Sequence, residues 1–507
     1  MRRDEDSRAQ KWGRRLLALL LGIVATAALP PIELPPALLI AFSGLLLVSR
    51  RVRRVGQAFW LGWWFGLGHL ASGLYWIANA FTIDSERFAW LIPFASLGLP
   101  AMLAIYSGLA LALVTLLRVE GVGRVLAFAV AWTGLEWLRG LLFTGFPWNL
   151  AASTWVAVPE ILQALSVIGA WGVTLLTVLV AGLPAALGHR YARRSIAAGI
   201  ALVALAWGYG YWRLAEASTA TVPGVRLRLV QASVPQQLKW QAEQRVATLA
   251  KHLAMTRTES PVEPTLVIWP ETAIPFLVEA EPDVLKAMAA AAPPGGAIVT
   301  GTIRLRGTGD PPEVTNGLVA IDEGGRVIAA YDKAHLVPFG EYTPAPWLFG
   351  WFPALGVGMV PGPGRRNIAL PGVPAASALI CYEVIFPGAV IDRDDRPQWL
   401  LNLTNDAWYG RSAGPYQHFA AARMRAVEEG LPLVRSAQNG ISGVIDAYGR
   451  ATGRLELDDV GAVDSALPAA LPPTVYSRWR ESPAAALALI IVTLGLLLDH
   501  RRKSGGN

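Results

Sequence analysis

The chain has 507 residues, of which 53% are hydrophobic and 16% are charged, and its formal net charge is +7. This apolar excess excludes an ordinary soluble protein and predicts a membrane protein. A single cysteine excludes an intramolecular disulfide and any cysteine-based zinc or iron–sulfur cluster. We therefore expect neither a metal ion nor another cofactor.

Apolar segments are concentrated in the first 213 residues. Seven of them are predicted membrane spans, and an eighth lies near the end of the chain. The first two are shorter than the ~20 residues that a spanning helix needs, which fits tilted or partly re-entrant helices. The predicted spans are Leu16–Leu29, Ala37–Val48, Gln57–Asn79, Phe88–Leu117, Val122–Leu142, Ile161–Leu187, Ile196–Trp212 and Ala484–Leu498.

The first apolar segment also has features of a secretory signal peptide. Arg14 and Arg15 precede a leucine run that ends in ATAALPP, and a signal peptide would be cleaved near Ala28. A retained signal anchor has the same features. Because further apolar segments follow at once, we interpret this segment as the first membrane helix.

Basic residues are unevenly distributed among the loops between the predicted spans. They precede the first span, separate the second and third at Arg50–Arg54, and end the chain, whereas the alternate connections contain few. By the positive-inside rule both termini are cytoplasmic, and residues from about Ala215 to Ser482 lie outside the cytoplasm. The loops also explain the net positive charge, so we expect no nucleic-acid partner.

The long segment between spans seven and eight is predicted to be one α/β domain. We expect a membrane domain of about seven helices at 1–213, a catalytic domain at 214–482, and a C-terminal helix with a basic tail at 483–507. Helical stretches at 242–257 and 418–429 alternate with short apolar runs. The runs expected to form strands are VRLRLVQAS, TLVIWPE, AIVTGTIRL, NGLVAIDE, AASALICYE and WLLNLTND.

Three segments of this domain carry chemically reactive residues at predicted strand ends. Glu271 follows LVIWP, Lys333 precedes Glu341 by eight residues in YDKAHLVPFGEYTP, and Cys381 ends SALIC. Considered singly, a free cysteine is most often a small buried core residue, and a glutamate or a lysine is most often exposed to solvent. Together they predict a nucleophile, because a carboxylate can take the thiol proton while an ammonium favours thiolate and stabilises an oxyanion.

The motifs WPETAIP, YDKAHLVPFGEYTP and ICYEVIFPG occur in this order, and LLNLTNDAWYGRSAGPYQHFAAARMRAVEEGLPLVRSAQNGISGVID follows them. With the preceding helices, they resemble the bacterial apolipoprotein N-acyltransferases, membrane-embedded members of the nitrilase superfamily. The resemblance covers essentially the whole chain. It implies a polytopic α-helical membrane domain joined to a periplasmic α/β domain with the nitrilase-like α-β-β-α sandwich fold.

The resemblance also implies a role for each matched residue. Cys381 would be the nucleophile, Glu271 the general base and acid, and Lys333 the cation that stabilises the oxyanion. Three residues match supporting positions: Glu341 beside the lysine and the attacking amine, Tyr382 as a backbone donor to the oxyanion, and Glu383 behind the nucleophile.

Two aromatic segments suggest how lipid reaches the thiol. Thr343–Gly364 is rich in Trp, Phe, Leu, Pro and Gly, and it forms either a core insertion or, as we favour, a lid that dips towards lipid. Phe143–Trp155 falls on the outer side between spans five and six. The residues expected to contact substrate are Trp240, Trp347, Phe349, Trp351, Phe146, Trp148 and Trp408.

Two further residues have simpler structural interpretations. His418 could partner the cysteine, but with Glu271 and Lys333 present we interpret it as structural. Glu136 lies within a predicted span, where carboxylates are functional candidates by default, and a local pair with Arg139 is the simpler explanation.

The function implied by the resemblance is a two-step acyl transfer. Cys381 takes an acyl chain from a membrane phospholipid, and the N-terminal amine of a diacylated apolipoprotein then accepts it, which completes lipoprotein maturation at the bacterial inner membrane. One alternative is a membrane-tethered amidohydrolase, which predicts a polar pocket and needs no lid. Another is a transporter with a sensing domain, although few paired intramembrane charges are evident.

Overall fold

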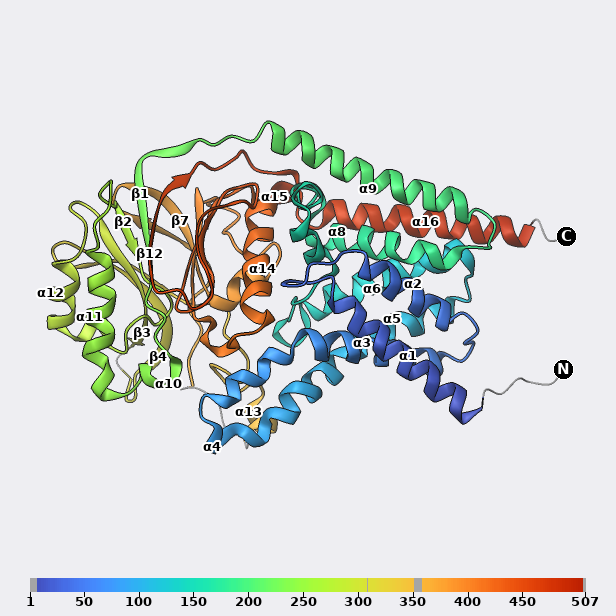
Figure 1. Cartoon of the computed structure of the whole chain (residues 1–507), viewed down its shortest axis with the longest axis horizontal. Coiled ribbons are helices and arrows are strands. Elements are labelled where there is room, and N and C mark those ends of the chain that lie inside the picture. The colour runs from blue at the N-terminus through green and yellow to red at the C-terminus, as the bar shows by residue number, and fades with distance from the viewer. Residues whose placement is uncertain (1–6, 308, 351–357, 505–507) are drawn as a thin grey trace. The chain divides into compact units, whose positions relative to one another are not determined.

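The computed structural model describes residues 7–307, 309–350 and 358–504 (Figure 1). The chain forms two compact units. The helical unit comprises Met1–Glu216 and Thr474–Asn507, and the sandwich unit comprises Ala217–Pro473.

Long apolar helices make up most of the helical unit, and each predicted span overlaps one of them. Among the described residues, three segments are long and apolar enough to cross a membrane, Ser85–Leu117, Leu165–Ala186 and Ala192–Ala215. The long helices are α1 (Arg8–Thr26), α2 (Ala37–Val48), α3 (Val55–Gly73), α5 (Leu99–Leu117), α6 (Gly121–Arg139), α8 (Leu165–Gly182), α9 (Ala192–Ala215) and α16 (Ser482–Ser504). Shorter helices are α4 (Ser85–Phe88), α7 (Pro159–Leu162) and α15 (Val475–Trp479).

Two predicted spans are less regular than expected. A π-helical turn at Phe94–Gly98 follows Pro93 and precedes α5. The span predicted at 161–187 is divided between α7 and α8, and Gly169 interrupts α8 with a φ of 62°. An added Cβ at Gly169 would lie 2.2 Å from the ring of Tyr476, so this position requires glycine for both conformation and space.

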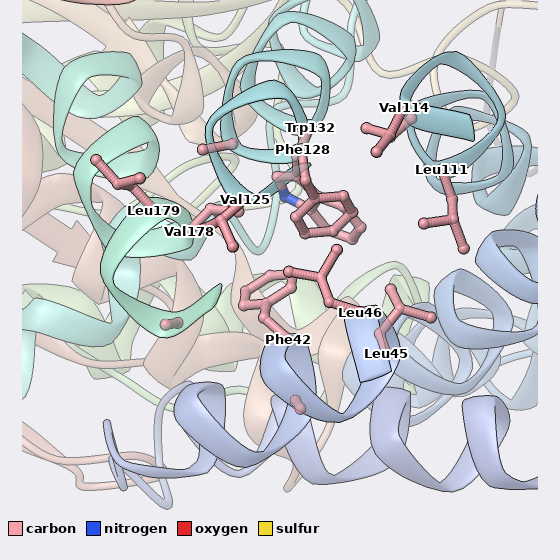
Figure 2. Close-up of a cluster of buried hydrophobic side chains, with 14 of the residues drawn as sticks. Phe42, Leu45, Leu46, Leu111, Val114, Val125, Phe128, Trp132, Val178 and Leu179 are labelled. Atoms are coloured by element: carbon pink, nitrogen blue, oxygen red, sulfur yellow. The ribbon is translucent and has the colours of Figure 1, made fainter. Parts of the chain in front are cut away.

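The core of the helical unit is built around aromatic side chains from α2 and α6. Phe42 packs edge to face against Trp132, with ring centroids 4.9 Å apart, and against Phe128 at 5.9 Å. Figure 2 shows these rings with the aliphatic residues that surround them, among them Leu111 from α5 and Val178 from α8. Such edge-to-face pairs add to the stabilisation that apolar burial provides.

The sandwich unit contains two six-stranded mixed sheets. The first has the order β12-β1-β2-β3-β4-β5, and the second has the order β11-β10-β9-β8-β7-β6. Strands of the first sheet are β1 (Thr221–Gln231), β2 (Leu266–Ile268), β3 (Ala297–Arg306), β4 (Glu313–Asp322), β5 (Val327–Asp332) and β12 (Gly461–Pro468). Strands of the second are β6 (Asn367–Leu370), β7 (Val373–Ile380), β8 (Trp399–Thr404), β9 (Leu433–Ala437), β10 (Ser442–Ile445) and β11 (Ala451–Leu455).

The two sheets share one apolar core, to which Ile268 and Val299 contribute from one side and Leu401 from the other. Helices α11 (Arg245–Thr256) and α12 (Pro282–Ala289) cover the outer face of the first sheet through Leu253 and Met288. Helix α14 (Ala413–Glu429) packs on β9 of the second sheet. These layers form the predicted α-β-β-α sandwich (Figure 1). Within the first sheet β1–β3 run parallel, and within the second sheet β7–β9 run parallel, so the ends of these neighbouring strands in each sheet point the same way.

Candidate active site

The three residues singled out at strand ends gather in one buried cluster of the sandwich unit. Glu271 follows β2, Lys333 follows β5 directly, and Cys381 follows β7 directly. Their exposed fractions are 6%, 1% and 6%. Lys333 Nζ lies 3.7 Å from Glu271 Oε1, and the charges of both groups act on the Cys381 thiol.

The Glu271 carboxylate has one oxygen engaged and one free. Oε1 accepts a hydrogen bond from Asn316 Nδ2 at 2.7 Å, whereas Oε2 has no hydrogen-bond partner among the described residues. The backbone of the turn is fixed against β3, because Gly301 N donates to Pro270 O at 3.1 Å and Ala273 N donates to Gly301 O at 3.2 Å. The free oxygen is therefore the one available to a proton.

Lys333 is held as a permanent cation. Its Nζ donates to Glu341 Oε1 at 2.9 Å, and the other oxygen of Glu341 accepts from Val337 N at 2.7 Å. Burial alone lowers the pKa of Lys333, but Glu341, Glu271 and Cys381 raise it above its ordinary value. Asn316 Nδ2 also donates to Glu341 Oε1 at 2.7 Å. Both oxygens of the Glu341 carboxylate are therefore engaged, Oε1 by Lys333 and Asn316 and Oε2 by Val337.

The backbone at Cys381 has an unusual conformation. Its φ is 50°, in the left-handed region, which costs a residue other than glycine about 1–3 kcal/mol. A 3₁₀ turn, Cys381–Ile385, begins there. His418 Nε2 donates to the Cys381 carbonyl oxygen at 3.1 Å, and His418 Nδ1 accepts from Arg435 Nη2 at 3.1 Å. His418 thus supports the backbone at Cys381 and has both ring nitrogens engaged.

The resting thiol is protonated. Burial, followed by the Glu271 charge, raises the pKa of Cys381 to about 12, and Lys333 lowers it only in part. Lys333 therefore acts in the direction expected from the sequence, but burial and the carboxylate outweigh it. A thiol in this state needs a nearby base before it can act as a nucleophile.

Glu383 connects the lysine loop to the turn at the cysteine. Its carboxylate is fully buried and accepts hydrogen bonds from four donors. These donors are the Tyr331 hydroxyl and the backbone N–H groups of Ala334, His335 and Ile380. Tyr382, the residue after Cys381, is buried, and its ring packs against His335 and Phe386 at centroid distances of 5.6 and 5.0 Å.

A buried ion pair behind the cysteine was not anticipated from the sequence. Arg435 Nη2 donates to Asp406 Oδ2 at 2.7 Å, and both side chains are completely buried. Burial raises the pKa of Asp406, but Arg435 and His418 outweigh it and lower that pKa to about 2. The available signal is an arginine within the apolar run LPLVRSA, where a buried charge requires a partner.

The aromatic residues expected to contact lipid have varied surroundings. In the sandwich unit, Trp240 and Trp347 are 53% and 85% exposed, Trp408 is half-buried, and Phe349 packs against Phe339. Trp351 lies outside the described residues. Their contact with substrate stays a prediction.

In the helical unit, the Phe146 ring stacks on the buried Trp148 ring, with centroids 6.0 Å apart. Their contact with substrate likewise stays a prediction. Glu136 and Arg139 form an ion pair at 3.6 Å, as the simpler interpretation predicted. Among the described residues, no group of three or more His, Cys, Asp or Glu side chains is placed to hold a metal ion.

Comparisons with known proteins agree with this architecture. Residues 21–183 match the family model of the apolipoprotein N-acyltransferase N-terminal domain, and residues 226–461 match that of carbon-nitrogen hydrolase. The second match confirms the predicted nitrilase-like fold. Among solved structures, similar chains include an amidase from Nesterenkonia sp. (21% identity, TM-score 0.35, 50% of this chain and 94% of that one) and a Saccharomyces cerevisiae member of the nitrilase superfamily (18%, 0.37, 53% and 97%).

Curated relatives match almost the entire chain. The apolipoprotein N-acyltransferase of Bradyrhizobium diazoefficiens is 42% identical, over 97% of this chain and 95% of the relative. That of Rhodopseudomonas palustris is 41% identical over 96% and 95%, and that of Brucella melitensis is 39% identical over 97% of both.

Proposed function

The chain belongs to the apolipoprotein N-acyltransferase family, and from this premise we propose that it acylates lipoproteins through a Cys381 thioester. The acyl donor is a membrane phospholipid. The acceptor is the N-terminal amine of a diacylglyceryl-cysteine apolipoprotein. The observation that supports this mechanism most directly is that three groups share one buried site. They are the protonated thiol of Cys381, the Glu271 carboxylate with its free oxygen, and the permanent cation of Lys333.

In the first step, Glu271 Oε2 accepts the thiol proton and Cys381 Sγ attacks the ester carbonyl carbon of the phospholipid. Lys333, with the backbone N–H of Tyr382, stabilises the oxyanion. The ester C–O bond then breaks, Glu271 returns the proton to the leaving oxygen, and a lysophospholipid departs. The acyl chain stays on sulfur as a thioester.

In the second step, the lipoprotein amine attacks the thioester carbonyl. The C–S bond breaks, and Glu271 takes the proton of the amine and passes it to the departing thiolate, which restores the enzyme. Since both oxygens of Glu341 are engaged by neighbouring donors, we assign its support to Lys333 rather than to the amine. The two half-reactions predict ping-pong kinetics.

Intact-protein mass spectrometry tests this proposal. Incubating the protein with vesicles of a phospholipid of defined chain length should add the mass of one acyl chain, because the thioester accumulates when no acceptor is present. Neutral hydroxylamine should remove the added mass, and prior alkylation with iodoacetamide should prevent it. Hydrolysis of a small amide without any acyl adduct would instead support the tethered amidohydrolase.

We further propose that the sandwich unit lies in the periplasm and that both termini are cytoplasmic. Support comes from the arginine-rich loops and from the three segments long and apolar enough to cross a membrane. In a Cys381→Ala background, a cysteine at Ser85 should react with an impermeant maleimide from the periplasm, and one at Arg51 should react only after lysis. Both positions are exposed, so the reverse result would contradict the topology.

A further inference from the structure

A second buried lysine lies beside the base, and the two-step mechanism does not use it. Lys239 ends the short helix α10 (Gln236–Lys239) and is completely buried. Its Nζ donates to Thr272 Oγ1 at 2.7 Å and lies 5.9 Å from the ring centroid of Trp240. Burying an ammonium is costly unless other groups compensate, so its presence here needs an explanation.

The partner of this lysine is the residue that follows the general base. Thr272 has a φ of 42°, a conformation that is strained for a β-branched residue and persists only where the surroundings enforce it. On one side, Gly301 of β3 packs so closely against the turn that an added Cβ would lie 2.5 Å from both Thr272 N and Glu271 Cα. On the other side, Lys239 donates a hydrogen bond to the Thr272 hydroxyl. The turn that carries Glu271 is therefore fixed between β3 and this lysine.

The charge of this lysine can change near neutral pH. Burial lowers the pKa of Lys239 to about 7, although the Glu271 charge opposes that fall. The Lys239 charge in turn acts on His252 of α11, whose pKa burial lowers to about 4, so that this histidine is neutral at pH 7. Lys333, by contrast, keeps its proton because its pKa is raised.

These charges bear directly on the first proton transfer. When Glu271 accepts the thiol proton its carboxylate becomes neutral, and the attraction between that carboxylate and a cationic Lys239 is lost. The cation therefore opposes the transfer, whereas the neutral amine does not. Raising the pH through about 7 should remove this opposition.

We propose that Lys239 is a positioning residue for the general base: it fixes the Glu271 turn through Thr272, and its protonation slows the loss of the Cys381 proton. The proposal rests on the proposed function in taking Glu271 and Cys381 as the reacting pair. It does not depend on the identity of the lipid donor or the acceptor.

Alkylation of Cys381 by iodoacetamide tests this proposal in the full-length protein, since it requires thiolate and no lipid. Rates for the wild type and for Lys239→Met are measured by intact mass between about pH 5.5 and 8.5. The ratio of the variant rate to the wild-type rate should be about tenfold larger at the acidic end than at the alkaline end, as expected for one neighbouring charge. At the alkaline end the variant should be slower than wild type, because the anchor on Thr272 is lost.

A double variant separates anchoring from charge. Because Lys239→Met and Thr272→Val remove the same hydrogen bond, the double variant at alkaline pH should be no slower than Lys239→Met alone. Lys286→Met, at a side chain 80% exposed, is the control, and its ratio to wild type should stay at one.

A Lys239→Met ratio that does not change with pH would overturn the proposal, because a residue needed only for packing slows the reaction equally at every pH. If that variant does not fold, Thr272→Val carries the test, and a wild-type alkylation rate in this isosteric variant would overturn the anchor. A wild-type protein that is alkylated normally but forms no thioester with phospholipid would contradict the proposed function and leave this inference intact.

Discussion

Replacing Cys381 with serine should lower the rate of acyl transfer by at least about 10⁴-fold. A hydroxyl loses its proton far less readily than a thiol, and the burial that raises the pKa of the Cys381 thiol to about 12 would oppose an alkoxide in the same way. Glu271 could not compensate for so large a difference. The measurement is transfer of a labelled acyl chain to a lipoprotein acceptor.

The nature of any residual adduct provides the control for this variant. An acyl chain on serine would be an oxygen ester, which resists the neutral hydroxylamine that removes a thioester. Serine is nearly isosteric with cysteine, so the backbone φ of 50° and the hydrogen bond from His418 to the carbonyl should persist, and thermal unfolding should be unchanged. Transfer within about tenfold of wild type would show that the acyl chain does not pass through Cys381.

Secondary structure could be predicted from the sequence where the residues that determine an element lie within that element or next to it. Apolar runs such as TLVIWPE and AASALICYE predicted β2 and β7, because periodicity and turn residues lie within a few positions of the strand. The polar residues that follow those strands, Glu271 and Cys381, could then be placed at strand ends, where α/β folds carry functional residues. Because β2 and β7 belong to different sheets, the packing of one sheet on the other brings the two residues together, and no local signal in the sequence encodes that packing.

The supporting groups could not be predicted, because their roles depend on contacts between distant segments. Lys239 in QQLKW has the appearance of a surface lysine, and only the fold buries it against Thr272. The pairing of Asp406 with Arg435 likewise requires the 3₁₀ turn Asp406–Tyr409 and β9 to meet after folding. The ring of Tyr476, a residue far along the chain, leaves no space for a Cβ at Gly169, and this requirement also cannot be seen in the local sequence.

Replacing Glu271 with glutamine should lower the rate of thioester formation by about 10²–10⁴-fold, the usual contribution of a general base. The amide oxygen can still accept the hydrogen bond from Asn316 but cannot take a proton from the thiol. Stopped incubations with phospholipid vesicles, analysed by intact mass, give the rate. Glu341→Gln is the matched control: it should slow transfer through Lys333 yet keep alkylation of Cys381 within about tenfold of wild type, since the base remains.

The pH dependence of the residual reaction distinguishes loss of the base from general damage to the site. In Glu271→Gln the thiol proton must leave to solvent, so alkylation should rise about tenfold per pH unit between about pH 7 and 9, in proportion to the thiolate fraction. In this variant burial still raises the pKa of Cys381, but the Glu271 charge no longer adds to that rise, while Lys333 still lowers the pKa. The pKa of Cys381 should therefore fall below the wild-type value of about 12. Alkaline pH should therefore partly restore the variant.

In the wild type an internal acceptor is already present, and the rise over the same range should be shallower. Equal slopes in the two proteins would show that solvent, and not Glu271, deprotonates Cys381.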